Sequence, residues 1–138
     1  MGKVIVATCV RNWDDLSLLA MGKLDTPLRA LEIEALVDTG ATSLYLKPSV
    51  IQALGLRQIG ERKALTMSNQ REVRRTFSPV QLEIQGRMAL LEVAELSEDL
   101  PNIVGQVPLE LMDWVVDVRG QKLIGNPDHG GEMLHEEF

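Results

Sequence analysis

Residues 36–43 read Leu36-Val37-Asp38-Thr39-Gly40-Ala41-Thr42-Ser43, and this stretch is the most informative part of the sequence. It closes a segment, residues 31–37, in which the odd-numbered positions are apolar, a period of two that is typical of a β-strand. An apolar strand therefore ends in an aspartate, and a small hydroxyl residue and a glycine follow at once. Aspartate, threonine and glycine are also common turn residues, so this stretch alone favours an ordinary turn.

A second motif lies about sixty residues further along the chain. It reads Asn102-Ile103-Val104-Gly105-Gln106 and leads into a short segment, residues 108–113, that is predicted to be helical. Taken alone, this motif predicts a core strand that ends in a turn. It becomes informative together with the Asp38 motif, because the two motifs occur in this order and at this separation.

The rest of the chain reads mainly as short strands. Alternating or apolar segments predict strands at residues 80–84, 88–94, 114–118 and 121–124, with hairpin turns at Gln85-Gly86-Arg87 and Arg119-Gly120. A second short helix is predicted from Lys47-Pro48 to Leu54, with Gly55 as its end. Residues 11–27 fit a strand, a helix or a packed loop equally well. Many short strands separated by glycine and proline indicate a mainly β fold that is closed or nearly so.

Length and composition limit the class of protein. The chain has 138 residues, of which 45% are hydrophobic, which fits a single domain with a sizeable core. Its formal net charge of −6 at pH 7 argues against a nucleic-acid partner. One cysteine, Cys9, excludes an intramolecular disulfide and is predicted to be a buried structural thiol. No apolar run is long enough to cross a membrane, so we expect no membrane partner and a cytoplasmic location.

The two motifs together resemble the single-domain, retropepsin-like (clan AA) family of aspartic peptidases, including its bacterial members. The resemblance covers about residues 30–125 of the printed sequence. It implies a closed acid-protease β-barrel with one or two short helices and one lobe per chain. We therefore expect a peptidase domain at residues 1–125 and a polar, flexible tail at residues 126–138. His129 and His135 lie in that tail at a spacing that matches no metal-ligand pattern, and the resemblance implies neither a metal nor a cofactor.

The resemblance also implies a mechanism. An aspartic peptidase needs two carboxylates that share one proton, because two like charges a few ångströms apart cannot both ionise cheaply. The sequence holds no second Asp-Thr-Gly and no Asp-Ser-Gly, so the partner of Asp38 must come from a second copy of the chain. The expected protein is a homodimeric endopeptidase that activates a water molecule between two Asp38 carboxylates and hydrolyses peptide or protein substrates.

Site residues follow from the same resemblance. The catalytic group is Asp38 with Thr39 and Gly40. The expected substrate-binding residues come from three places: the same loop (Ala41 and Thr42), the second motif (Ile103, Val104 and Gly105) and a hairpin that folds over the peptide, called the flap (Met67, Ser68, Asn69 and Gln70).

The predicted flap, residues 65–73, departs from the family in two ways. It contains no glycine, and none occurs from Glu61 through Ile84, whereas flaps in the family often carry glycine. Residues 57–75 also hold six basic residues against two acidic ones, a net charge of +4. A solvated hairpin with charged edges explains this charge. The alternative hypothesis is that the hairpin selects acidic peptides or docks on an acidic tail of a neighbour.

Two other functions remain open from the sequence. The fold can serve as a dimerisation or peptide-binding module with little or no hydrolysis, which the unusual flap favours. Alternatively, Asp38-Thr39-Gly40 is an ordinary turn in an unrelated β-barrel. Peptide cleavage that depends on Asp38 would support the endopeptidase hypothesis and contradict both of these alternatives.

Overall fold

A computed structural model describes residues 3–137. Residues 1 and 2 of the predicted peptidase domain and residue 138 of the predicted tail lie outside the described residues. The long strands are β1 (Val4–Asn12), β2 (Ala30–Val37), β4 (Gln58–Leu65), β5 (Arg71–Ile84) and β6 (Arg87–Glu95). The short strands are β3 (Leu44–Leu46), β7 (Asn102–Val104), β8 (Trp114–Asp117) and β9 (Lys122–Gly125). The helices are α1 (Trp13–Ala20), α2 (Pro48–Leu54), α3 (Gln106–Leu111) and the short 3-10 helix η1 (Pro127–His129).

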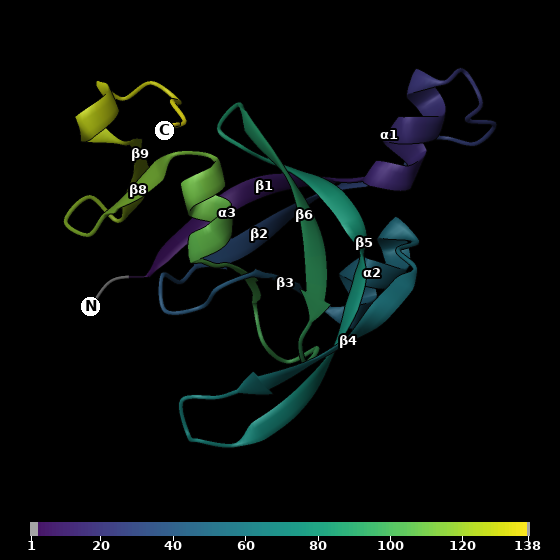
Figure 1. The fold of residues 1–138 in the computed structure, drawn as a ribbon, viewed down its shortest axis with the longest axis horizontal. Coiled ribbons are helices and arrows are strands. Elements are labelled where there is room, and N and C mark those ends of the chain that lie inside the picture. Colours follow the sequence, from purple (N-terminus) through teal and green to yellow (C-terminus); the bar gives the residue numbers. More distant parts are fainter. Residues whose placement is uncertain (1–2, 138) are drawn as a thin grey trace.

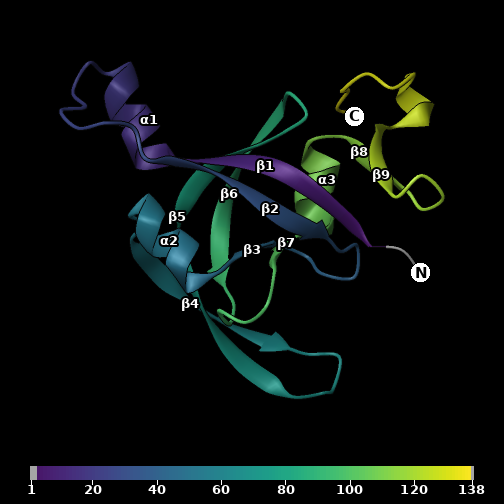
Figure 2. The same cartoon turned by 180° about the vertical axis from the view of Figure 1, so that it is seen from behind.

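Within residues 3–137, seven strands form one sheet in the order β1-β2-β7-β3-β6-β5-β4, and β1 also pairs with β5. The additional pairing closes the sheet into a barrel and leaves β4 outside the closure, attached to β5. Figures 1 and 2 show the consequence: the hairpin of β4 and β5 projects beyond the barrel. The mainly β, closed architecture predicted from the sequence is confirmed. No helix in the described part of the chain has both the length and the apolar character needed to span a membrane.

The barrel encloses one hydrophobic core. Along β1, alternate side chains from Val4 to Asn12 are buried, and the same alternation brings Val80, Leu82 and Ile84 of β5 inward. Cys9 occupies an outward position on β1, across from Glu32 and Glu83, and is half-buried. The prediction of a buried Cys9 is therefore wrong, because the strand period places this residue on the outer face.

Helix α2 agrees with the sequence: Pro48 lies in its first turn and Gly55 ends it at φ 64°. Helix α3 begins and ends two residues before the predicted segment 108–113. It ends early because Asp113 has a left-handed φ of 57°, which a helix cannot continue through. The ambiguous residues 11–27 contain the end of β1 and α1, whose N-cap is the buried Asn12; the Asn12 side chain accepts from the Asp15 amide.

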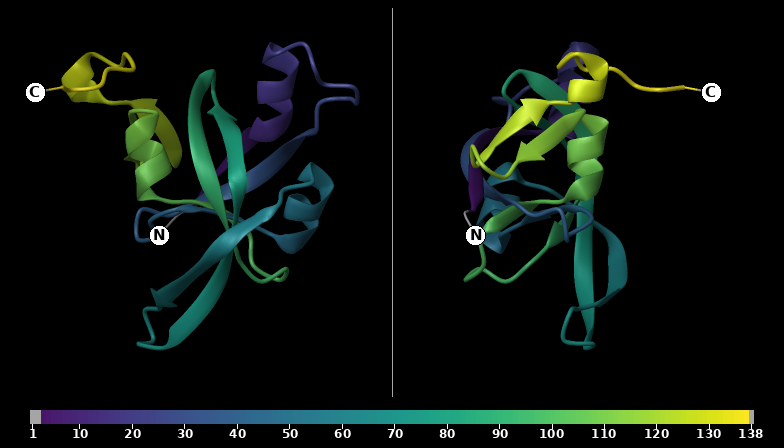
Figure 3. Two further views of the ribbon diagram at one scale, coloured as in Figure 1. Left: turned by 45° about the vertical axis from the view of Figure 1, so that its right-hand side comes forward. Right: turned by 90° about the vertical axis from the view of Figure 1, so that its left-hand side faces the viewer.

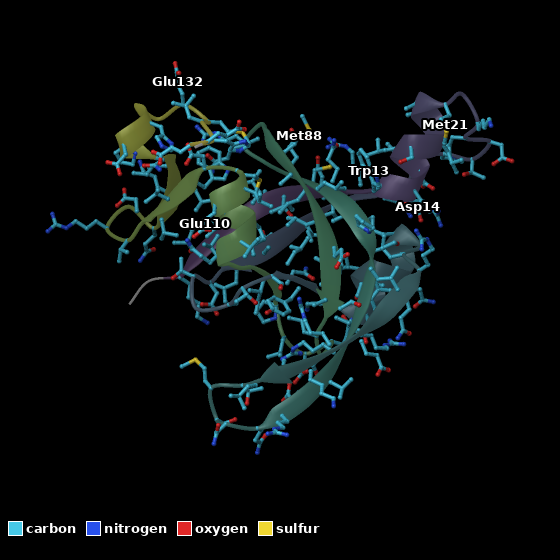
Figure 4. The ribbon with its side chains drawn as sticks, viewed as in Figure 1. Trp13, Asp14, Met21, Met88, Glu110 and Glu132 are labelled. Atoms are coloured by element: carbon cyan, nitrogen blue, oxygen red, sulfur yellow. The ribbon has the colours of Figure 1, made fainter. Side chains whose placement is uncertain are left out.

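The segment that follows β9 packs against the barrel side. Arg87 of β6 donates to the carbonyls of Met112, Asp113 and Gly131, and its guanidinium lies 4.0 Å from the centre of the Trp114 ring. In Figure 4, Glu132 marks this segment and Met88 marks the neighbouring end of the β5–β6 hairpin. Figure 3 shows that the segment and α1 lie on the side of the barrel away from the β4–β5 hairpin.

Candidate active site

The loop after β2 presents Asp38 to solvent. The Asp38 amide donates to the Val104 carbonyl (3.0 Å), which continues the β2–β7 pairing by one residue. Its carboxylate Oδ1 accepts from the Gly40 amide (2.9 Å), and its carbonyl accepts from the Ala41 amide (3.1 Å). These bonds form a tight turn that fixes the carboxylate. Asp38, Thr39 and Gly40 are all exposed in the single chain.

The second motif holds this loop from behind. Strand β7 lies between β2 and β3, parallel to the first and antiparallel to the second. The amides of Gly105, Gln106 and Val107 donate to the carbonyls of Ser43 (2.8 Å), Ala41 (2.8 Å) and Thr42 (3.0 Å). The two motifs that are distant in sequence are therefore joined by backbone hydrogen bonds, and the start of α3 is tied to the Asp38 loop.

A cleft of about 270 Å³ borders Asp38. Its walls come from the loop after β2, the β4–β5 hairpin and the connection between β6 and β7. The lining residues are Asp38, Gly40, Ala41, Tyr45, Ala64, Leu65, Thr66, Met67, Arg74, Leu96, Leu100 and Ile103. Asp38 is the one carboxylate among them, so a single chain offers one acid and a largely apolar surface.

The hairpin of β4 and β5 occupies the position predicted for the flap. Its turn is closed by the Thr66 amide, which donates to the Gln70 carbonyl (2.9 Å), and by the Asn69 amide, which donates to the Thr66 carbonyl (2.9 Å). Asn69 supplies the positive φ of 62° that glycine provides in many turns. Met67 at the turn is fully exposed, and Leu65 is 68% exposed, so the hairpin offers apolar side chains to solvent.

The structure brings five of the sequence-predicted site residues to the cleft: Asp38, Gly40, Ala41, Met67 and Ile103. Seven others do not line it. Ser68, Asn69 and Gln70 belong to the exposed turn, while Val104 and Gly105 are buried behind the loop. Thr39 is exposed beside Asp38, and the Thr42 hydroxyl lies 3.2 Å from the hydroxyl of Tyr45.

Several lining residues were missed by the sequence reasoning, chiefly Tyr45, Arg74, Leu96 and Leu100. The period of two along β5 is the signal that identifies Arg74, because alternate residues of a strand share a face. Burial of the Tyr45 hydroxyl opposes its ionisation. Hydrogen bonds with Thr42 and Ser43 and the positive charge of Arg62 outweigh that effect, so the pKa of Tyr45 lies below its usual value.

The described part of the chain holds no cluster of potential metal ligands. Among residues 3–137, no three histidine, cysteine, aspartate or glutamate side chains converge as metal ligands do. The chemistry that the cleft offers is that of a carboxylate on a fixed loop, beneath a hairpin and beside apolar pockets.

Comparisons with known proteins agree with this geometry. The sequence model of a family described as "Aspartyl protease" matches residues 28–106, more than half of the chain. Among solved structures, the chain is similar to EIAV protease complexed with the inhibitor HBY-793, with a TM-score of 0.55 and 14% sequence identity. The match covers 79% of this chain and 86% of that one, and it shows the retropepsin-like fold with one lobe per chain. No curated protein matched the sequence.

Proposed function

We propose that this chain, which belongs to the aspartyl protease family, is an aspartic endopeptidase that works as a homodimer. The observation that carries the proposal is the position of Asp38. It is exposed on a hydrogen-bonded loop, it is the one carboxylate of the cleft in the described chain, and a β-hairpin borders the same cleft. A lone carboxylate of this kind needs a twin to do acid–base chemistry on a peptide bond.

The chemistry follows from pairing two such loops across a two-fold axis. Two neighbouring Asp38 carboxyl groups hold one proton between them, because two adjacent negative charges repel. The ionised carboxylate removes a proton from a water molecule as its oxygen attacks the scissile carbonyl carbon, and the protonated carboxyl donates to the carbonyl oxygen. Transfer of a proton to the amide nitrogen then breaks the C–N bond and releases an amine and a carboxylic acid.

The neighbouring residues take positioning roles in this proposal. The Gly40 amide holds Oδ1 of Asp38, which fixes the orientation of the carboxylate. Thr39 bonds across the axis to the loop of the partner, and Gly105 allows the loop and β7 to approach closely. The β4–β5 hairpin closes over the bound peptide, with Leu65 and Met67 against its side chains.

The remaining proposals concern the protein as a whole. Its partners are a second copy of itself and peptide or protein substrates, and the peptidase domain ends near residue 125. A cytoplasmic location is supported by the single cysteine of the chain, since a reducing compartment leaves that thiol unpaired.

A comparison of Asp38→Asn with Asp25→Asn tests the activity. Both replace an exposed aspartate, and Asp25 lies in the loop between α1 and β2, outside the cleft. An unstructured protein substrate is incubated with each variant from acid to neutral pH, with and without a statine-type inhibitor. We expect Asp38→Asn to lower the cleavage rate about 10²-fold or more, and Asp25→Asn to leave it unchanged.

Two outcomes would contradict the proposal. Equal cleavage by wild type and Asp38→Asn places the activity elsewhere. Stable dimers that bind peptides but cleave nothing at any pH instead support the binding module, which the glycine-free hairpin favours.

A further inference from the structure

We propose that the cleft selects peptides that carry an acidic side chain, which Arg62 and Arg74 of the β4–β5 hairpin bind. The inference rests on the proposed function and names the substrate class of that same site.

Arg62 and Arg74 lie directly opposite each other in the antiparallel pairing of β4 and β5. Side chains of directly opposed residues project from the same face of a sheet. On β4 that face also carries Ala64, which lines the cleft together with Arg74 and with Thr66, the first residue after the strand. The register therefore places the two guanidinium groups on the face that carries Ala64, while Lys63 and Arg71 lie on the other face and do not line the cleft.

Arg74 is held against the cleft wall. Its side chain is only 22% exposed, and its guanidinium carbon lies 5.7 Å from the centre of the Tyr45 ring, which lines the same cleft. Burial raises the pKa of Tyr45 and hydrogen bonds with Thr42 and Ser43 lower it, and Arg62 is close enough to add a smaller lowering effect. A planar guanidinium fixed on an aromatic ring is well oriented for a carboxylate.

The positive charge on this face is only partly neutralised. Arg74 pairs with Glu72, two residues along the same strand, at 3.0 Å, and the Glu72 side chain is 46% exposed. Arg62 forms no ion pair within residues 3–137. Like charges directly opposite each other destabilise a strand pair, so a carboxylate from a ligand relieves a repulsion that the free hairpin retains.

Apart from Asp38 and Thr66, the rest of the cleft is largely apolar, and Leu96, Leu100 and Ile103 line it. A peptide that fits both parts has an acidic residue near the scissile bond and apolar residues around it. The substrate carboxylate must lie on the Tyr45 side, because Asp38 repels a second negative charge close to it.

Peptides of one apolar scaffold test the inference, with Glu, Gln or Lys placed in turn at each position near the scissile bond. The enzymes are wild type, Arg62→Gln, Arg74→Gln, Arg74→Glu and the control Arg71→Gln, which removes the same charge from a residue of the same hairpin that does not line the cleft. We expect wild type to prefer Glu over Gln about tenfold in kcat/KM at one position, since a charge-assisted bond of this kind is worth one such factor.

The arginine variants should differ in how they change the preference for Glu over Gln. Arg74→Gln removes the preference, Arg62→Gln reduces it, and Arg74→Glu shifts it toward Lys. Arg71→Gln retains the preference. Added salt weakens the preference of wild type, because the ion pair lies at a partly open surface.

The inference is overturned if wild type cleaves the Glu and Gln peptides equally at every position, a result that leaves the peptidase proposal intact. It is equally overturned if Arg71→Gln abolishes the preference as Arg74→Gln does, or if the arginine variants change only the oligomeric state. If no peptide is cleaved, the peptidase proposal fails instead. Binding of the same labelled peptides, measured by fluorescence anisotropy, then decides the arginine selection: equal affinity for Glu and Gln peptides refutes it.

Discussion

At the scale of single residues, the Ile-Val-Gly motif is explained by space. A Cβ atom on Gly105 would lie 2.6 Å from the Ser43 carbonyl oxygen and 2.7 Å from that of Ala41, closer than real Cβ contacts allow. Both carbonyls accept hydrogen bonds from this turn, so neither can move away without losing a bond. Gly105 is therefore required for the close approach of β7 to the Asp38 loop.

Gly105→Ala tests this explanation. We expect a loss of about 1–3 kcal/mol in the free energy of unfolding, because overpacking of a buried backbone contact forces the loop to shift. Urea denaturation measures the loss. Gly60→Ala is the matched control, since its added Cβ meets only the Thr76 hydroxyl at 3.4 Å, an ordinary contact. A Gly105→Ala protein as stable as Gly60→Ala would contradict the close-approach argument.

The candidate site was predictable from the sequence where a residue sits inside a motif. Asp38, Gly40 and Ile103 were found in this way, and the structure brings them to one cleft. Tyr45 and Leu100 carry no local signal, because they reach the cleft only through the β3–β7 pairing and the loop that follows β6. Contacts of that kind depend on the closed barrel and not on neighbours in the chain.

At the scale of elements, the sequence predicted the strands whose side chains alternate and missed what depends on tertiary contacts. Strand β2 matches its predicted range within one residue, and the Gln85-Gly86 turn has the positive φ values of a tight hairpin. Strand β5 is much longer than the predicted segment 80–84, because its outer half is polar and is stabilised by pairing with β4. The start of helix α1 is marked by its N-cap, Asn12, whose role depends on a side-chain hydrogen bond that the sequence does not show.

The C-terminal segment makes contacts that no pattern in the sequence indicated. Asp113 is buried, and its carboxylate accepts from the Asn126 side chain (3.2 Å), the His129 ring (2.5 Å) and the Leu134 amide (3.1 Å). His129 also contacts Glu136 at 2.8 Å. These partners are far apart in the sequence and follow no period, so a polar composition suggested only a solvated tail.

The contact between Asp113 and His129 should depend on the protonation of both side chains. The hydrogen bond with His129, opposed by desolvation and aided by the bonds from Leu134 and Asn126, lowers the pKa of Asp113 to about 2. Asp113 and then Glu136 raise the pKa of His129 above its usual value of 6.5. The Asp113 contribution to stability is complete above its unfolded pKa of 3.8 and is lost as the pH falls toward 2. The His129 contribution is complete below pH 6.5 and is lost as the pH rises through its folded-state pKa.

His129→Gln should therefore destabilise the protein most between about pH 4 and 6.5. Thermal melts of wild type and variant across the pH range measure the difference in Tm, which should shrink both below and above this window. His135→Gln is the control, because His135 bonds only to the Leu111 carbonyl among the described residues. A difference in Tm that is constant with pH would show that the pair is not charged in the folded protein.

At the scale of the whole molecule, one chain forms a closed barrel and supplies one carboxylate to the cleft. All strands of the closed sheet are supplied by a single chain, so the barrel needs no partner to close. The cleft, in contrast, contains one carboxylate, and the mechanism proposed for it uses two. Activity should consequently depend on assembly although folding does not.

Mixing wild-type and variant subunits tests whether activity depends on dimerisation. Wild-type chains are preincubated with an equal amount of Asp38→Asn chains, and cleavage of an unstructured protein is followed. Random pairing leaves about a quarter of the dimers with two wild-type chains, so activity per wild-type chain should fall to about half. Mixing with Asp25→Asn, which keeps Asp38, should leave activity per chain unchanged. If mass-tagged chains form mixed dimers and activity per wild-type chain is still undiminished, one Asp38 suffices and the shared-proton mechanism is wrong.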